Sequence, residues 1–159
     1  MTRTTKPSDF PQAELMKVGL YSALARKHIR KLREEITKLD VGIDAESLKS
    51  FRKTIMNSKI SYRTKLHSVM DLYSLSEFRD LLFHVKEHQF SIPQIKECLA
   101  DMDFSLCGFF NEKVIQEFKL KYENPNDLCD LDKWNDLEKD NPDLFANMYQ
   151  FWCQKTIQG

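Results

Sequence analysis

Short apolar runs and longer amphipathic stretches alternate along the chain and predict strands and helices in turn. Residues 15–21 form an apolar run that is too short for a typical helix, which favours a strand buried on both faces. Residues 103–110 and 148–154 are short and rich in aromatic side chains, which favours two further strands. The pattern therefore predicts a small sheet of three strands.

Between the first two strands, apolar residues recur every three or four positions, as in amphipathic helices. We expect Ser22 to cap the first helix, which runs to about Leu39, because a serine hydroxyl accepts hydrogen bonds from the free N–H groups of a first turn. Asp44 is expected to cap a second helix in the same way, and a weaker helical stretch covers residues 60–70. This region is thus predicted to be entirely helical.

Capping sequences mark the later helices. Ser-x-x-Glu at 74–77 and Ser-x-x-Gln at 91–94 have the form in which a side chain and a backbone N–H cap each other reciprocally. They predict a helix over 77–88 and another after the second sequence. Asn111 is expected to cap one more helix, and a short acidic helix follows it.

The element order predicts a mostly helical α/β fold, with a large helical connection between the first two strands. The 159 residues fit one domain, which we expect over residues 15–159 after a poorly ordered lead-in at 1–14. No apolar run approaches the roughly 18–20 residues that a membrane span needs, so a cytoplasmic protein without a membrane partner is expected.

Charge and cysteine content narrow the function classes. Lys/Arg and Asp/Glu are equal at 24 each, but residues 1–70 carry 15 and 7 of them and residues 71–159 carry 9 and 17. The two halves are expected to attract each other or to face different partners. The four cysteines form no Cys-x-x-Cys pair, so reduced, mostly buried thiols are expected rather than a zinc site or a disulfide framework.

Candidate chemistry gathers in the helix over 77–88. His84 and His88 share a helical face and could hold a divalent metal, but no third ligand is placed by spacing, and no metal site is predicted. Asp80 lies four residues before His84 and could hydrogen-bond its ring, which would suit a general base or a substrate-holding imidazole. A capped helix with a solvated face is the alternative.

Two charged surfaces are further candidates. The basic helix at 26–33 could follow phosphates, but only Tyr21 lies nearby as an aromatic platform, and nucleic acid is not an expected partner. The acidic pairs Asp130/Asp132 and Glu138/Asp140 predict a solvated face, because no neighbouring sequence indicates burial of one carboxylate. The four glycines stand isolated, without the Gly-x-Gly-x-x-Gly loop that brings backbone close to a nucleotide-like cofactor.

Three segments nevertheless resemble one family. LMKVGLYS at 15–22, LYSLSEFRDLLFHVKEHQFSIPQI at 72–95 and MYQFWCQK at 148–155 are similar to the C-terminal part of bacterial class I S-adenosylmethionine-dependent methyltransferases, of the type often fused to tetratricopeptide repeats. The resemblance covers residues 15 to about 155. It implies that the three strands are the last three of a seven-stranded sheet, with the final strand inserted antiparallel between a parallel fifth and sixth.

The resemblance also implies which residues bind the methyl acceptor, because the helical flank between the fifth and sixth strands can roof that side of the active site. The acceptor-pocket candidates are Tyr73, Ser74, Arg79, Asp80, His84 and His88. The family's glycine-rich loop and ribose-binding acid would precede residue 1. We therefore expect no cofactor on the isolated chain, although the complete family uses S-adenosylmethionine, and no complete methyltransferase activity.

A truncated sheet would leave the strand at 15–21 with a free edge, which invites pairing with another chain. The expected partner is a second copy of the chain or a separate cofactor-binding chain, unless residues 1–14 cover the edge. A monomeric mass with rapid exchange of the Val18 and Leu20 amides would argue against both. The alternative functions are a helical interaction or regulatory domain, and a small metal- or nucleic-acid-binding protein.

Overall fold

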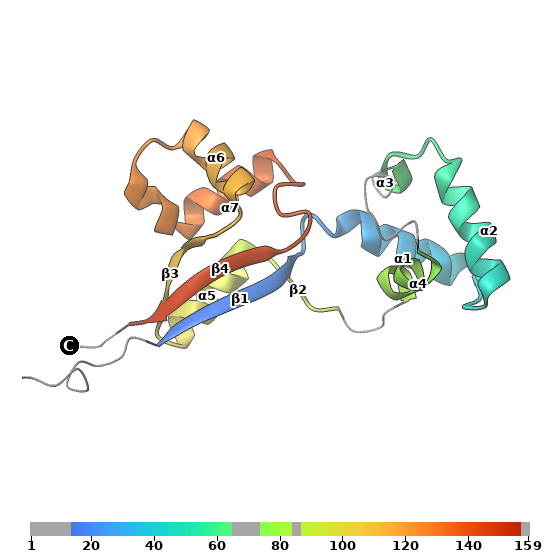
Figure 1. The fold of residues 1–159 in the computed structure, drawn as a ribbon, viewed down its shortest axis with the longest axis horizontal. Helices are drawn as coiled ribbons and strands as arrows, with labels where there is room; N and C mark the ends of the chain where they lie inside the picture. The colour runs from blue at the N-terminus through green and yellow to red at the C-terminus, as the bar shows by residue number, and fades with distance from the viewer. Residues whose placement is uncertain (1–13, 65–73, 84–86, 157–159) are drawn as a thin grey trace, which may run out of the picture. The chain divides into compact units, whose positions relative to one another are not determined.

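The computed structural model describes residues 14–64, 74–83 and 87–156 (Figure 1). The chain divides into two compact units, which we call the sheet unit and the helical unit. The sheet unit comprises the chain up to Ser22 and from Phe90 onward, and the helical unit comprises Ala23–Gln89. Most of the predicted helical connection is therefore a compact unit of its own, whereas its last helix, at 92–101, belongs to the sheet unit. The predicted lead-in lies, apart from residue 14, outside the described residues.

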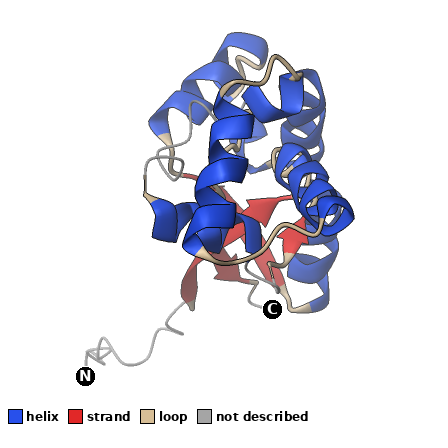
Figure 2. Cartoon of the chain, turned by 90° about the vertical axis from the view of Figure 1, so that its right-hand side faces the viewer, coloured by secondary structure: helices blue, strands red, loops and turns tan. Residues whose placement is uncertain are grey.

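Four strands form one sheet in the order β2-β1-β4-β3. Figure 2 shows the strands in red among the helices. The strands are β1 (Leu15–Ser22), β2 (Gln89–Phe90), β3 (Phe104–Phe109) and β4 (Tyr149–Lys155). β4 is antiparallel to both β1 and β3, so those two strands run parallel to each other. The α/β class and the three predicted strands are confirmed, each strand within one residue at either end. The number of strands was wrong by one, because the two residues of β2 are too few to show a period.

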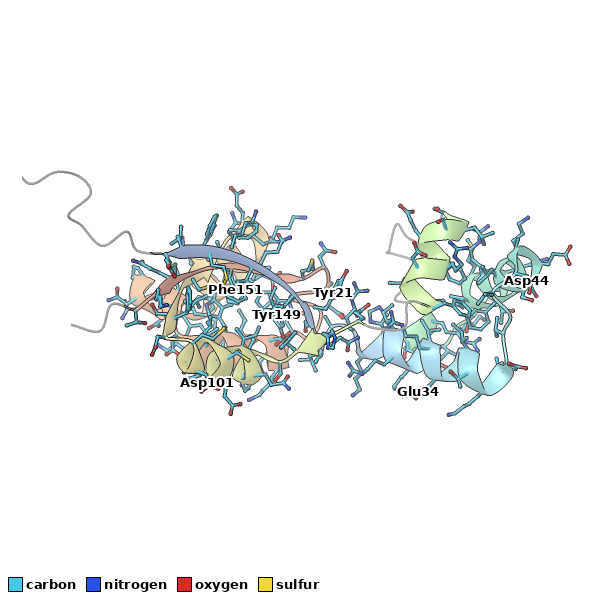
Figure 3. All side chains as sticks on the ribbon, turned by 90° about the horizontal axis from the view of Figure 1, so that it is seen from below. Tyr21, Glu34, Asp44, Asp101, Tyr149 and Phe151 are labelled. Carbon is cyan, nitrogen blue, oxygen red and sulfur yellow. The ribbon has the colours of Figure 1, made fainter. Side chains whose placement is uncertain are left out.

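The two faces of the sheet differ in burial. Tyr149, Phe151 and Cys153 on β4 are buried, and Figure 3 labels the first two among the side chains between the sheet and the helices of its unit. Gln150 and Trp152 alternate with them and are exposed. We call these the inner and the outer face. Because paired residues share a face, the register places Met16, Val18 and Leu20 on the inner face, and Leu15, Lys17, Gly19 and Tyr21 on the outer face.

The helices of the sheet unit form one core with the inner face. They are α5 (Ile92–Asp101), α6 (Glu112–Lys121), the 3₁₀ helix η4 (Pro125–Cys129) and α7 (Leu131–Asp140). Their buried residues lie at helical spacing and join the inner-face side chains in a single cluster. Trp134 is at its centre, where its ring stacks on Phe118 at 4.0 Å between centroids.

The predicted caps of this unit are present. Ser91 and Gln94 form the reciprocal capping box, with Pro93 in the first turn of α5. The Asn111 side chain accepts hydrogen bonds from the Lys113 and Val114 N–H groups at the start of α6. These side chains fix where the helices begin, and so fix the ends of the strands before them.

The helical unit has a separate core. It contains α1 (Lys27–Leu39), α2 (Ala45–Met56), the short α3 (Ser61–Thr64) and α4 (Leu75–Phe83). Asp44 caps α2 as predicted. The buried positions repeat every three or four residues along α1, α2 and α4, and they are Ile29, Leu32, Ile36, Leu48, Phe51, Ile55, Phe78, Leu81 and Leu82.

Three boundary predictions in this region need correction or lie outside the description. The first helix begins at Lys27 and not directly after Ser22, which stays in β1 and caps nothing there. α4 begins at Leu75, two residues before the predicted start at 77, because Ser74 itself is the capping residue. Of the stretch at 60–70, residues 65–70 lie outside the described residues. Among the helices that the structure describes, none is long and apolar enough to cross a membrane.

Candidate functional site: an open strand edge and a buried carboxylate

The predicted acceptor-pocket residues are only partly described, since Tyr73 and His84 lie outside the described residues. The Ser74 hydroxyl accepts a hydrogen bond from the Glu77 N–H at 3.4 Å, so it caps α4. Arg79 and Asp80 are exposed neighbours on α4 and form an ion pair at 3.7 Å. His88 is exposed and follows α4 outside any helix. The structure thus gives Ser74 a structural role and leaves Arg79, Asp80 and His88 on the surface.

The metal hypothesis for His84 and His88 is not tested, because His84 is outside the description. Within residues 14–64, 74–83 and 87–156, no group of three or more potential ligands gathers to hold a metal ion.

The arginines of α1 hold the end of α4 and the segment after it. Arg33 donates to the Leu81 carbonyl oxygen at 2.7 Å and to Glu87 at 3.1 Å, and Arg26 lies 3.6 Å from the same Glu87. Arg30 donates to the Ala23 carbonyl oxygen and to Gln89. The basic face predicted at 26–33 therefore serves the fold of the helical unit, and no observation favours phosphate binding by it.

The acidic residues of α7 are likewise engaged within their own unit. The Asp130 side chain caps α7, and Asp132 and Asp140 pair with Lys96 and Lys121 at 2.6 and 2.5 Å. These pairs are exposed and contribute little to stability. Most of the predicted acidic face is therefore engaged by local contacts and does not form a separate acidic surface.

Glu138 departs from that prediction, because it is buried. Its side chain is 3% exposed and accepts hydrogen bonds from Ser22 Oγ at 2.5 Å and from the Tyr149 hydroxyl at 2.7 and 2.8 Å. Burial raises the pKa of Glu138 above its usual range, and the two hydroxyl donors oppose this by stabilising the carboxylate. Burial also raises the pKa of Tyr149.

This cluster links the last residue of β1, the first residue of β4 and α7. It therefore fixes the carboxyl end of β1, which is the end of a parallel strand at which open α/β sheets usually bind ligands. The sequence contained a sign of this burial, since Glu138 continues the inward row of Leu131 and Trp134 at spacings of three and four. Because Asp140 lies two positions after Glu138, the sequence instead favoured an exposed acidic pair.

Within the part of the chain that the structure describes, the side of β1 away from β4 has only the two-residue β2 as a neighbouring strand. The Lys155 N–H donates to the Glu14 carbonyl oxygen at 3.0 Å, so Glu14 and Lys155 are a hydrogen-bonded pair. In an antiparallel ladder every second residue forms such a pair, so in β1 the even-numbered residues bond to β4. The backbone groups of Val18 and Leu20 therefore point to β4, and those of Leu15, Lys17 and Gly19 point away from it. The prediction that the Val18 and Leu20 amides report on the free edge is therefore wrong, because both amides bond to β4. β2 has only two residues and can satisfy only part of the outer edge.

The outer face beside this edge exposes two large apolar side chains among the described residues. Leu15 is 58% exposed and Trp152 is 37% exposed, although both are large apolar side chains. Lys17 lies over the Phe110 ring at 4.4 Å from its centroid, on the same side of the sheet. The prediction that this strand is buried on both faces is therefore wrong for the described chain. Among the described residues, a strand edge with few partners thus lies next to exposed Leu15 and Trp152, and such a surface is of the kind that another protein element covers.

Comparison of the chain with protein-family models and with curated proteins finds no match to either. The class that the structure itself defines is an α/β protein, with an antiparallel strand between two parallel ones and a compact helical unit between β1 and β3.

Proposed function

We propose that this chain is the C-terminal module of a class I S-adenosylmethionine-dependent methyltransferase, and that it works with a cofactor-binding half on a separate chain, which pairs with the outer edge of β1. The observation that carries the proposal is the strand arrangement. β4 lies antiparallel between the parallel strands β1 and β3, and β4 is the last of the three in sequence. The family resemblance implies this order and these directions for the final three strands.

The open edge supports the second part of the proposal. Leu15, Lys17 and Gly19 have N–H and C=O groups on the side away from β4, and a further parallel strand would satisfy those that the two-residue β2 leaves without a partner among the described residues. In the arrangement that the resemblance implies, that strand is the fourth strand of the cofactor-binding half. Elements of the same half would cover the exposed Leu15 and Trp152.

The described residues do not fit the methyl donor by themselves. Gly19 and Gly108 lie inside strands and Gly42 lies between α1 and α2, so none of them opens a helix after a strand to form a phosphate- or nucleoside-type cradle. At the carboxyl end of β1, Ser22 is buried and bonded to Glu138. We therefore assign donor binding to the partner half and derive no chemical step on this chain.

Substitution of Lys17 by proline tests the proposed pairing. Proline removes an outward N–H but leaves the inner ladder to β4, since edge positions tolerate it. We expect the wild-type chain, used as bait in an extract of its source, to retain a protein that becomes labelled when radioactive S-adenosylmethionine is cross-linked by ultraviolet light. Lys17→Pro is expected to reduce the labelled protein at least tenfold.

Lys17→Ala is the matched control, because it removes the side chain and keeps the N–H; it should retain the labelled protein. Circular dichroism checks that each variant is folded. Micromolar binding of S-adenosylmethionine to the purified chain alone, seen by calorimetry, would contradict the proposal. So would equal retention by Lys17→Pro, a retained protein that takes no label, or a homodimer that forms through β1 and excludes any partner.

We propose that the acceptor contacts Arg79 and Asp80 on the exposed face of α4. Ser74 and His88 lie near the two ends of this helix in sequence. In the assembled enzyme, Arg79→Ala and Asp80→Asn are expected to raise the KM for the acceptor severalfold. The free energy of unfolding should change by less than about 0.5 kcal/mol, because both side chains are more than half exposed. Steady-state kinetics and urea unfolding measure the two effects, and an unchanged KM would remove these residues from the site.

A further inference from the structure

Cys107 and Cys129 lie close together although 21 residues separate them in sequence. Cys107 occupies a β-bulge, where the register of β3 with β4 shifts between Leu106 and Gly108. A bulged residue stands outside the regular ladder, and the Cys107 side chain is exposed. Cys129 ends η4, which packs against β3, and it is exposed as well.

Two observations indicate that the thiols are neighbours. The Cys129 sulfur lies 3.5 Å from the Cys107 carbonyl oxygen, so standard backbone dimensions place it within about 6 Å of the Cys107 Cα. The pKa of Cys107 is raised, first by partial burial of the sulfur and second by the charge of Cys129. A disulfide joins Cα atoms about 4.4–6.8 Å apart, and the approach of the Cys129 sulfur to the Cys107 backbone makes the two residues close neighbours.

We propose that Cys107 and Cys129 form a dithiol site, which a small-molecule disulfide such as oxidised glutathione converts to an intramolecular disulfide. One cysteine thiolate attacks a sulfur of the glutathione disulfide, forms a mixed disulfide and releases one glutathione thiolate. The second cysteine thiolate attacks the protein sulfur of the mixed disulfide, forms the Cys107–Cys129 bond and releases the second glutathione. The two protons of the protein thiols end on the two glutathiones.

The other two cysteines differ from this pair: the pKa of Cys153 is raised first by burial and second by the charge of Cys107, so Cys153 is near Cys107 but buried, and Cys98 is exposed on another element. Cys153 is fully buried on the inner face, where its thiol donates to the Met16 carbonyl oxygen at 3.6 Å. Cys98 is exposed on α5, and since Cys107 and Cys129 are exposed too, the expectation of mostly buried thiols is wrong. They therefore serve as internal comparisons for the proposed pair.

Redox titration of the full-length chain tests the site. The reduced chain is equilibrated with oxidised and reduced glutathione, free thiols are alkylated, and intact mass and peptide mapping identify the products. We expect the Cys107–Cys129 cross-link to exceed glutathione mixed disulfides at these positions by about tenfold, because a neighbouring thiol acts at high effective concentration. Cys107→Ser and Cys129→Ser should each accumulate the mixed disulfide on the remaining cysteine.

Cys98→Ser is the matched control, an exposed thiol elsewhere in the same unit, and it should leave the cross-link unchanged. Three results would overturn the proposal: glutathione on both Cys107 and Cys129 of one molecule without a cross-link, a predominant disulfide that includes Cys98 or Cys153, or resistance of both thiols to oxidised glutathione. The variants replace exposed side chains, so folding of each is checked simply by circular dichroism.

Discussion

Replacing Trp134 by alanine is expected to lower the free energy of unfolding of the sheet unit by about 3–5 kcal/mol. The side chain is fully buried, stacks on Phe118 and lies 4.7 Å from Phe109 between ring centroids. Its Nε1 donates to the Leu128 carbonyl oxygen at 2.9 Å, which ties η4 to α7. Alanine would leave a cavity at the centre of the core and an unpaired carbonyl group, and both effects destabilise the folded state.

The second tryptophan provides the control. Trp152→Ala removes the same side chain from the exposed outer face, where 37% of Trp152 is accessible, and should cost about 1 kcal/mol or less. Urea unfolding followed by circular dichroism measures both variants. Because the chain has two compact units, the transition of the sheet unit is followed separately by the fluorescence of the remaining tryptophan. Equal losses for the two variants would contradict the placement of Trp134 in the core.

Glu138→Gln is expected to flatten the dependence of stability on pH. Burial raises the pKa of Glu138, so the folded state binds its proton more tightly than the unfolded state does. The contribution of this group to stability is therefore complete below the ordinary glutamate pKa of about 4.3, and it is lost as the pH rises through the higher folded-state pKa. The slope in that window is at most about 1.4 kcal/mol per pH unit for one proton.

Urea unfolding of the wild type and of Glu138→Gln between pH 4 and 8 measures this difference. The stability of the wild type relative to the variant should fall as the pH rises above about 4.3 and then become constant. Glutamine keeps an oxygen that can accept from Ser22 or Tyr149, so the comparison mainly removes the titration. Parallel curves for the two proteins would show that Glu138 titrates alike in the folded and unfolded states.

Local patterns in the sequence were enough to predict the strands and most helix caps. β1, β3 and β4 are short apolar or alternating runs, and Asp44, Ser91 and Asn111 act on their own first turns. Such features depend on residues a few positions apart, which is why the sequence alone reveals them. The two-residue β2 has no such pattern, since its place depends on the neighbouring strand.

Features that depend on distant residues were missed. Ser22 has the side chain of a helix cap, but Glu138, 116 positions later, takes its hydroxyl. Arg26 and Arg33 have the spacing of a solvated basic face, but Glu87 and the Leu81 carbonyl group bind them. The candidate acceptor residues were offered on the resemblance, and the described ones among them have only local contacts, the Ser74 cap and the exposed Arg79–Asp80 ion pair.

The separation of the two hydrophobic cores has a consequence for how this architecture can vary. The helical unit has its own core, and its chain enters after β1 and leaves through β2, which are adjacent strands of the sheet. Its two ends are therefore close together, as in an inserted cassette. A lineage could lengthen, exchange or delete such a cassette without altering the strand register, so that changes in this unit need not disturb how the sheet is assembled.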